Sequence, residues 1–509
     1  MKTLILRRNI WILSLTVISV TTLLFLGSIR IIPYVTSTSG SSIGYYCITN
    51  TVDLFDDLTI HEIAIHMDDD DYEEMITTYK ETSEKEYYKV DVEIDGVLIE
   101  DVGIRLKGNL TLNTALGTTN NMDIGKDRMN EFPGDMNVGE MPNMEEMQAF
   151  MQKGQVPNFE GINEGGFGGM SGGQVPYLLK FDEFITGQTY EGYTEIAIRT
   201  GDTAQLAEQI AYYAYALAGV TAPQTSYASV TINGETQLYS LAQNIDESFV
   251  VEHFENSDGV LYKAGNFVQF EYLGDDPSLY VESFEQKTNI NDDDLTPLIK
   301  FLQFVTESSD KEFEEQLSDW LDINSFMAMM ALDELLGNSD SFVGMGSNFF
   351  LYFDNELEQF TLLSWDANMS LGSGMGGGMG RGMDQDEQGQ LEMQGIWQNQ
   401  GELPENFAGV KGAQFGVIGE EREGGMKSGS NILKDRFFAN EKFSAMYEDV
   451  YENLETLLYR SDILLKQTEE LSVVFEQYNK EHGIVDEEEY NKSVNNIVSY
   501  IEQKMVEID

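Results

Sequence analysis

The fold is decided by residues 334–372, which read ELLGNSDSFVGMGSNFFLYFDNELEQFTLLSWDANMSLG. An apolar helical pattern runs up to Gly337, and two short apolar segments follow, at 348–353 and 360–364, with a polar turn between them. The pattern predicts a helix followed by a β-hairpin. Asp340 and Asp366 stand at the ends of these elements, so we expect both carboxylates to face one cleft.

Two readings of these acids remain open. Two carboxylates held near the amide of Asn348 provide the oxygen ligands that hard cations prefer, and one carboxylate could instead take a proton from an attacking hydroxyl. An Asp that follows Gly-Asn-Ser is also a common turn cap, which is a purely structural role.

Outside this segment, strands dominate the first half of the chain and helices the second. Asp95-Gly96 and Asn233-Gly234 are favoured two-residue turns and predict two hairpins. One helix, expected at 203–218 and ended by Gly219, interrupts the strands. Strands are expected at 53–67, 88–94, 97–106, 177–181, 225–232 and 236–242, and helices over 294–336 and 431–509. This order predicts an α+β, two-lobed fold.

We divide the chain into a strand-rich N-lobe-like part, 53–250, and a helical C-lobe-like part, 251–509. Each part contains a segment rich in Gly and Met, at 113–175 and 372–430. We interpret both segments as low-complexity insertions within one domain, either inert or offering adaptable methionine surfaces.

The N-terminus predicts a membrane anchor. Arg7 and Arg8 precede an uncharged, apolar run at 10–29, and about 20 helical residues span the roughly 30 Å of a bilayer core. A cleavable signal peptide is the alternative. The positive flank favours a cytoplasmic start within 1–35, a tether at 36–52 and a main domain outside a bacterial cell membrane.

Composition excludes several functions. The 88 Asp and Glu against 30 Lys and Arg give a formal net charge of −58, which repels phosphate backbones and therefore excludes sequence-independent nucleic-acid binding. Cys47 is the only cysteine, so no intrachain disulfide can form, and four histidines make a His-rich metal centre improbable. The acidic runs at 68–71 and 292–294 lack calcium-loop spacing, and we interpret them as solvated.

The basic residues suggest a phosphate site. Lys180 lies in an apolar strand, and Glu208 lies on the helix that follows, so we expect an ion pair that holds Lys180 against a phosphate. Arg105 and Lys107 form a basic spot at a strand end, which could approach phosphates or could simply be a solvated hairpin end.

Lys180, Glu208, Asp340, Asn348 and Asp366 follow the order of functional residues in protein-kinase-like folds. On this order the chain resembles the CotH-type spore coat kinases. The segments that carry the resemblance are RLKGNLTL, YLLKFDEF, AQLAEQIAYYAYALAGVTAPQTSYASVTING, QLYSLAQNIDESFV, GVLYKAG, ELLGNSDSFVGMGSNFFLYFD and LLSWDANMSLG.

The resemblance implies an atypical protein-kinase-like fold and transfer of the ATP γ-phosphoryl group to Ser of protein substrates, with Mg²⁺ or Mn²⁺. Asp340 would be the catalytic carboxylate, and Asp366, with Asn348, would bind the metal. Nucleotide-binding residues would be Lys180, Glu208, Arg105 and Lys107. Substrates would be Ser-rich and basic, which suits the acidic chain. The kinase D-F-G triplet is replaced by Trp365-Asp366-Ala367, so regulation by a Phe flip is not expected.

A second hypothesis is a non-catalytic, membrane-anchored surface or adhesion protein that retains the CotH fold. An outward-facing domain would meet little ATP. The two insertions also adjoin the expected cleft, where they could gate it or block it. The chain retains all four charged positions of the kinase order, which are Lys180, Glu208, Asp340 and Asp366. This retention argues for activity, because a pure binding protein has no physical need for these residues.

Overall fold

The computed structural model describes residues 46–108, 110–117, 174–200, 203–265, 268–289, 295–344, 346–373, 431–484 and 486–508. The predicted membrane anchor and most of both Gly/Met-rich insertions lie outside these ranges. Among the described residues, no helix combines the length and the apolarity needed to cross a membrane.

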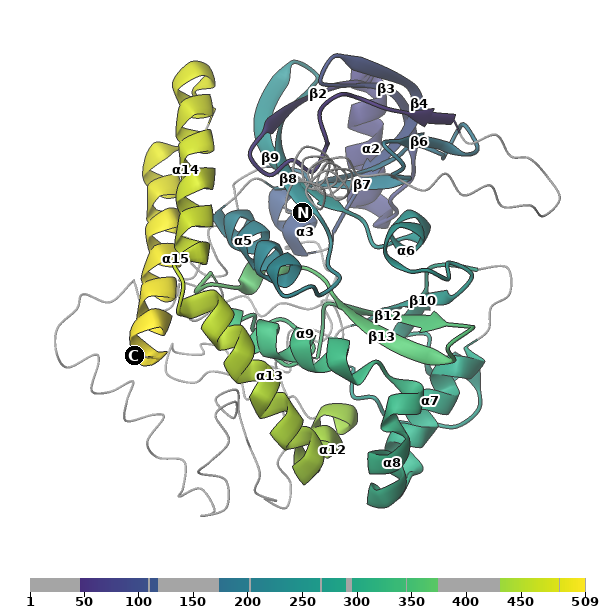
Figure 1. Ribbon diagram of the computed structural model, residues 1–509. Coiled ribbons are helices and arrows are strands. Elements are labelled where there is room, and N and C mark those ends of the chain that lie inside the picture. Colours follow the sequence, from purple (N-terminus) through teal and green to yellow (C-terminus); the bar gives the residue numbers. More distant parts are fainter. Residues whose placement is uncertain are drawn as a thin grey trace, which may run out of the picture. The chain divides into compact units, whose positions relative to one another are not determined.

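Seven strands in the first half of the chain form a closed barrel (Figure 1). Their order is β2 (Ile60–His66), β3 (Tyr88–Ile94), β4 (Val97–Leu106), β5 (Tyr177–Lys180), β7 (Glu195–Thr200), β9 (Glu235–Gln243) and β8 (Thr225–Ile232). A parallel pairing of β2 with β8 closes the barrel, and all other neighbours are antiparallel.

Both predicted hairpin turns are confirmed. Asp95 and Gly96 have φ of +48° and +79°, and Asn233 and Gly234 have φ of +49° and +78°. Positive φ at both central residues is the type I′ geometry that matches the twist of the paired strands. These turns set the registers of β3 with β4 and of β8 with β9.

Shorter elements surround the barrel. They are β1 (Tyr46–Ile48), paired with β6 (Gln188–Tyr190), and the helices α2 (Asp69–Thr82), α3 (Leu110–Ala115) and α6 (Glu247–His253). The acidic run at 68–71 begins α2, a helix that we did not predict. Its carboxylates occupy the first turn, where the helix dipole favours negative charge. The run at 292–294 lies outside the described residues.

A second, four-stranded sheet has the order β11 (Phe284–Gln286), β10 (Val260–Ala264), β12 (Phe349–Asp354) and β13 (Gln359–Ser364). The helices of the second half pack with it into a large hydrophobic core. They are α7 (Thr296–Glu307), α8 (Asp310–Trp320), α9 (Ile323–Leu336), α12 (Ile432–Ala439), α13 (Glu441–Tyr459), α14 (Ile463–His482) and α15 (Glu487–Ile508), with the short 3₁₀ turns η3 (Pro277–Leu279) and η5 (Ala367–Met369).

The mixed α+β class is therefore confirmed, whereas the kinase-like topology and the boundary at 250 stay predictions. The helix expected at 203–218 is α5 (Thr203–Leu217). Its buried residues, among them Leu206, Ile210 and Tyr215, belong to the helical core and not to the barrel core, which is a separate cluster. The chain thus passes from the barrel into the second core and returns to the barrel at β8.

Helix α9 runs through the second core, and its last eight residues, from Met329 to Leu336, are all buried. Its ends are sharply defined. The Asp322 side chain accepts hydrogen bonds from the N–H groups of Asn324 and Ser325 at the start, and Gly337, at φ +70°, ends the helix in the left-handed conformation. This ending fixes where residues 338–340 leave the helix.

The C-terminal helices connect the two cores. Helices α14 and α15 lie side by side (Figure 1). On the barrel side, the Phe475 ring packs edge-on against Tyr227 at 4.5 Å between centroids, and Gln467 Nε2 donates to Asp57 Oδ2 at 2.7 Å. On the other side, Ile497 and Ile501 of α15 are buried in the helical core. The helix pair α14–α15 therefore holds the barrel against the helical core.

Candidate active site

The turn after α9 carries Asp340. The Asn338 N–H donates to the Asp333 carbonyl at 2.8 Å, its side chain donates to the Asp333 carboxylate at 3.1 Å, and the Ser341 hydroxyl donates to the Asn338 carbonyl at 2.9 Å. Asn348, which precedes β12 at φ +51°, donates through Nδ2 to Asp340 Oδ2 at 2.9 Å. The predicted grouping of Asp340 with Asn348 is therefore present.

Asp366 reaches the same place through the β12–β13 hairpin. Phe349 pairs with Ser364, and the Trp365 N–H donates to the Asn348 carbonyl at 3.0 Å, so the residues just outside the paired strands emerge at one end. Asp366 itself has φ +59°. Burial, followed by the negative charge of Asp366, raises the pKa of Asp340 to about 7. The two acids are thus close enough to interact electrostatically, whereas the cleft expected between them stays a prediction.

Glu208 is paired with a different cation from the predicted one. Arg199 on β7 donates from one guanidinium nitrogen to both carboxylate oxygens of Glu208 at 2.6 Å, and from another to Asp366. Lys180 instead lies 3.2 Å from Glu183. The predicted ion pair between Lys180 and Glu208 is wrong.

The barrel register explains this error. Lys180 on β5 stands opposite Glu195 on β7, four residues and about 13 Å along the strand from Arg199. Arg199 lies four residues before the start of α5, the helix that carries Glu208. The Glu208 side chain is fully buried, so it needs a partner within its own surroundings. Burial opposes the charge on Arg199, but Asp366 and Glu208 outweigh it and raise the pKa of the guanidinium. Burial also raises the pKa of Glu208, to about 7.

A group of cations faces these acids. Lys107, just after β4, donates from Nζ to Asn244 Oδ1 at 3.2 Å and lies 5.5 Å from the centre of the Trp365 ring. The Arg199 guanidinium lies 5.8 Å from the same ring. Burial, with the positive charges of Lys263 and Arg199, lowers the pKa of Lys107 to about 7. Lys107 and Arg199 thus lie over the same ring, that of the residue before Asp366, and Arg199 also contacts Asp366 itself.

Lys263 on β10 completes this group. Its Nζ lies 5.8 Å from the Phe350 ring centre, and burial and Lys287 lower its pKa. Among the described residues, no carboxylate oxygen lies within 4 Å of Nζ of Lys107 or of Lys263. We call Arg105, Lys107, Arg199 and Lys263 the cation cluster.

The cation cluster is only partly balanced. Asn244 joins Lys107 to Glu195, because its Nδ2 donates to Glu195 Oε2 at 2.6 Å. Arg105 stacks over Tyr87 at 5.2 Å. Burial and neighbouring positive charges lower the pKa values of Lys107 and Lys263, and a nearby anion would favour their charged forms. The cation cluster therefore suits an anionic ligand, although the chain as a whole carries a net charge of −58.

The arrangement also fits a divalent cation. Within the described residues no three His, Cys, Asp or Glu side chains gather into a metal-binding group. Mg²⁺, however, commonly uses only one or two protein carboxylates together with substrate phosphates. Asp340 and Asp366 repel one another, and Arg199 contacts only Oδ1 of Asp366. The remaining carboxylate oxygens and the Asn348 amide form a hard donor set beside the cation cluster.

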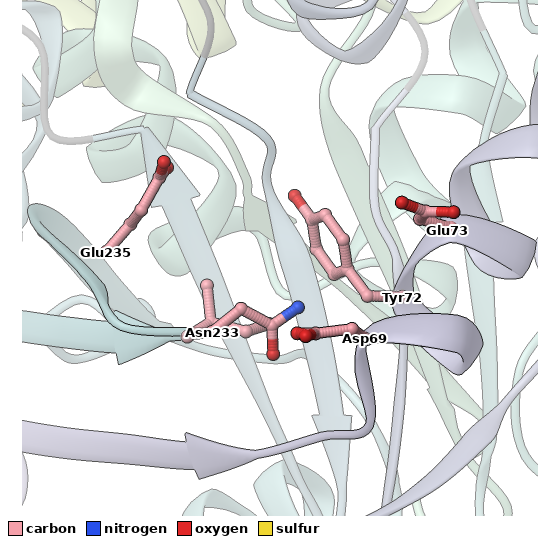
Figure 2. A pocket seen from close by; sticks show the side chains of 6 residues that line it. Asp69, Tyr72, Glu73, Asn233 and Glu235 are labelled. Atoms are coloured by element: carbon pink, nitrogen blue, oxygen red, sulfur yellow. The ribbon is translucent and has the colours of Figure 1, made fainter.

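A separate pocket lies where the start of α2 meets the β8–β9 turn (Figure 2). Asp69, Glu73 and Glu235 line it together with Tyr72, Ile232 and Asn233. None of the candidate active-site residues described in this subsection lines this pocket, and its acidic lining is unsuited to phosphates.

Sequence reasoning missed Arg199 and Lys263. Arg199 lies in EIAIRT, which alternates apolar and polar residues only briefly, and Lys263 lies in VLYKA, a five-residue strand. Either strand could have been found from its run of β-branched and aliphatic residues.

A family model described as CotH kinase protein matches residues 166–508. This range contains every residue of the site except Arg105 and Lys107. No curated protein matches the chain.

Proposed function

This chain belongs to the CotH kinase family, and we propose that it is an active kinase that transfers the γ-phosphoryl group of ATP to Ser of protein substrates. Kinases in general act on ATP with a divalent metal. The observation that carries the proposal is the meeting, around Trp365, of the partly buried cations Lys107 and Arg199 with the acids Asp340 and Asp366. A metal-loaded triphosphate would bring negative charge to Lys107 and Lys263 and positive charge to the two acids.

In the proposed complex, Lys107, Lys263 and Arg199 bind the phosphates. Glu208 would hold Arg199 in place through its two hydrogen bonds. From the sequence, Glu208 was expected to hold Lys180 in this way. Arg105 on β4, the remaining member of the cation cluster, and Lys180 on the neighbouring strand β5 would contact the outer part of the nucleotide. Asp366 and Asn348 would hold Mg²⁺ or Mn²⁺, which neutralises charge on the phosphates when bound.

Asp340 would accept the proton of the attacking serine hydroxyl. A bond forms between the serine oxygen and the γ-phosphorus, the bond from that phosphorus to the bridging β,γ-oxygen breaks, and ADP leaves. The raised pKa of Asp340, about 7, suits a proton acceptor near neutral pH. The hydrogen bond from Asn348 orients the carboxylate.

The acidic chain favours basic, Ser-rich substrates through long-range attraction. The test is to incubate the full chain with γ-labelled ATP and Mn²⁺ or Mg²⁺ and a basic Ser-rich peptide, with the same peptide carrying Ala for Ser as control. We expect label on phosphoserine that depends on the metal. Binding of metal and nucleotide without transfer would contradict the kinase proposal. Partner binding with no nucleotide binding would favour the non-catalytic surface protein.

The affinity for ATP should fall as pH rises above about 7. Lys107 has a pKa of about 7 in the free protein, so it loses its charge above that pH, and bound phosphate favours the charged form. Binding at pH 8 therefore takes up a proton. Calorimetry in two buffers of different ionisation enthalpy measures this uptake.

The matched control is Lys107→Gln, in which proton uptake should largely disappear and affinity should be low at every pH. Equal proton uptake by the variant and the native chain would show that Lys107 does not contact the phosphates.

A further inference from the structure

Tyr500 of α15 lies against two glycines from the segments that carry the acids. A Cβ added to Gly337, three residues before Asp340, would lie 2.6 Å from the Tyr500 hydroxyl oxygen. A Cβ added to Gly372, six residues after Asp366, would lie 3.5 Å from Tyr500 Cδ2. One aromatic side chain therefore fills the space beside both segments.

The two segments are also joined at this point by their backbones. The Leu371 N–H donates to the Leu336 carbonyl at 2.7 Å. The hydroxyl of Tyr500 donates to the Leu335 carbonyl at 3.2 Å, and that of Tyr459 donates to the same carbonyl at 2.7 Å. Tyr500 thus touches the junction through its ring and through its hydroxyl.

The position of Tyr500 is set by the helix that carries it. Ile497 and Ile501, on either side of it in the chain, are fully buried in the helical core. Gly337 and Gly372 have φ of +70° and +77°, where a residue with a side chain is strained. Because neither glycine has a side chain, Tyr500 can approach the backbone of both segments closely.

We propose that Tyr500 is a positioning residue that fixes the distance between Asp340 and Asp366. This inference rests on the proposed function for its effect on catalysis. A displacement of about 1 Å in a catalytic group can cost about 10²-fold in rate. The cations assigned to the phosphates lie on β7, on β10 and just after β4, and Tyr500 contacts none of these elements in the described structure. Its loss should therefore act on kcat and spare the KM for ATP.

The experiment compares Tyr500→Ala, Tyr500→Phe and the control Tyr490→Ala in the full chain. Tyr490 is on the same helix, ten residues before Tyr500, and its ring packs against that of Phe475 on α14 at 5.0 Å between centroids. We expect kcat to fall about 10–100-fold in Tyr500→Ala, with the KM for ATP changed less than about threefold. Tyr500→Phe should stay within about threefold of native, because the ring remains and Tyr459 still bonds Leu335. Tyr490→Ala should leave kcat near native.

A second set of variants covers the case in which Tyr500→Ala does not fold. Gly337→Ala should lower kcat, and adding Tyr500→Phe should restore part of it by removing the oxygen that lies 2.6 Å from the new Cβ. Equal kcat in Gly337→Ala and the double variant would overturn the proposal, as would native kcat in Tyr500→Ala.

Amide hydrogen exchange separates this proposal from the proposed function. The Leu371 amide should exchange faster in Tyr500→Ala, or in Gly337→Ala, than in native chain, whereas Tyr490→Ala should not affect it. If the native chain transfers no phosphate but Leu371 responds in this way, the kinase proposal fails and the positioning contact stands. If Leu371 does not respond, the positioning contact fails by itself.

Discussion

Replacing Asp340 by Asn is expected to lower the rate of phosphoryl transfer by about 10²–10⁴-fold, the usual contribution of a positioned general base. The asparagine retains the shape of the side chain but cannot accept the serine proton. The native rate should rise with pH through about 7 as Asp340 loses its proton, and this step should be absent from Asp340→Asn. Rates with labelled ATP from pH 5.5 to 8.5 measure both effects.

The control is Asp319→Asn, which makes the same chemical change at an exposed position on α8. It should leave the rate and its pH dependence unchanged. Nucleotide binding should survive in Asp340→Asn, because the phosphates are assigned to Lys107, Arg199 and Lys263. A native rate in Asp340→Asn would remove Asp340 from its proposed role and leave it as the turn cap considered from the sequence.

Replacing Arg199 by Met is expected to destabilise the fold by about 3–5 kcal/mol, the cost of leaving a buried charge without its partner. Glu208 is fully buried and receives two hydrogen bonds from Arg199. The same substitution at Lys180 should cost less than about 1 kcal/mol, because Lys180 and Glu183 are 30% and 29% exposed and their ion pair is screened by solvent. Urea denaturation of both variants gives the two free energies of unfolding.

A double variant tests the cause. Arg199→Met together with Glu208→Gln should recover part of the lost stability, because the unpaired buried charge is then removed. Arg199→Met should also abolish ATP binding, whereas Lys180→Met should only weaken it. The account is contradicted if Lys180→Met lowers the free energy of unfolding as much as Arg199→Met does, or more. Lys180 would then be the structural and nucleotide-binding cation, as predicted from the sequence.

The parts of this site that the sequence predicted are those set by local chemistry. Gly337 ends a helix, and a short hairpin returns the chain, so Asp340, Asn348 and Asp366 meet through contacts between residues less than 30 positions apart. Asp95-Gly96 and Asn233-Gly234 were equally predictable, because only a few turn geometries fit those residues.

The pairing of Glu208 was not predictable in this way. It depends on which barrel strand adjoins α5, and a strand cation followed by a helical Glu satisfies the pattern for Lys180 as well as for Arg199. β7 was missed because it is short and nearly all buried, so it lacks the alternation of a half-exposed strand. Because β7 was not predicted, Arg199 was not considered as the partner of Glu208.

The contact of Tyr500 with the site was beyond sequence reasoning for a related reason. It joins residues more than 120 positions apart, and a tyrosine on an amphipathic helix carries no local mark of a partner. Only the packing of α15 against the end of α9 identifies it.

The most direct test of the account is a crystal structure of the full chain with Mn²⁺ and a non-hydrolysable ATP analogue. We predict the triphosphate in contact with Lys107 and Arg199, and Mn²⁺ on Asp366 with the γ-phosphate near Asp340. A nucleotide bound anywhere else, or one whose phosphates contact Lys180 while Arg199 and Lys107 remain apart from them, would contradict it.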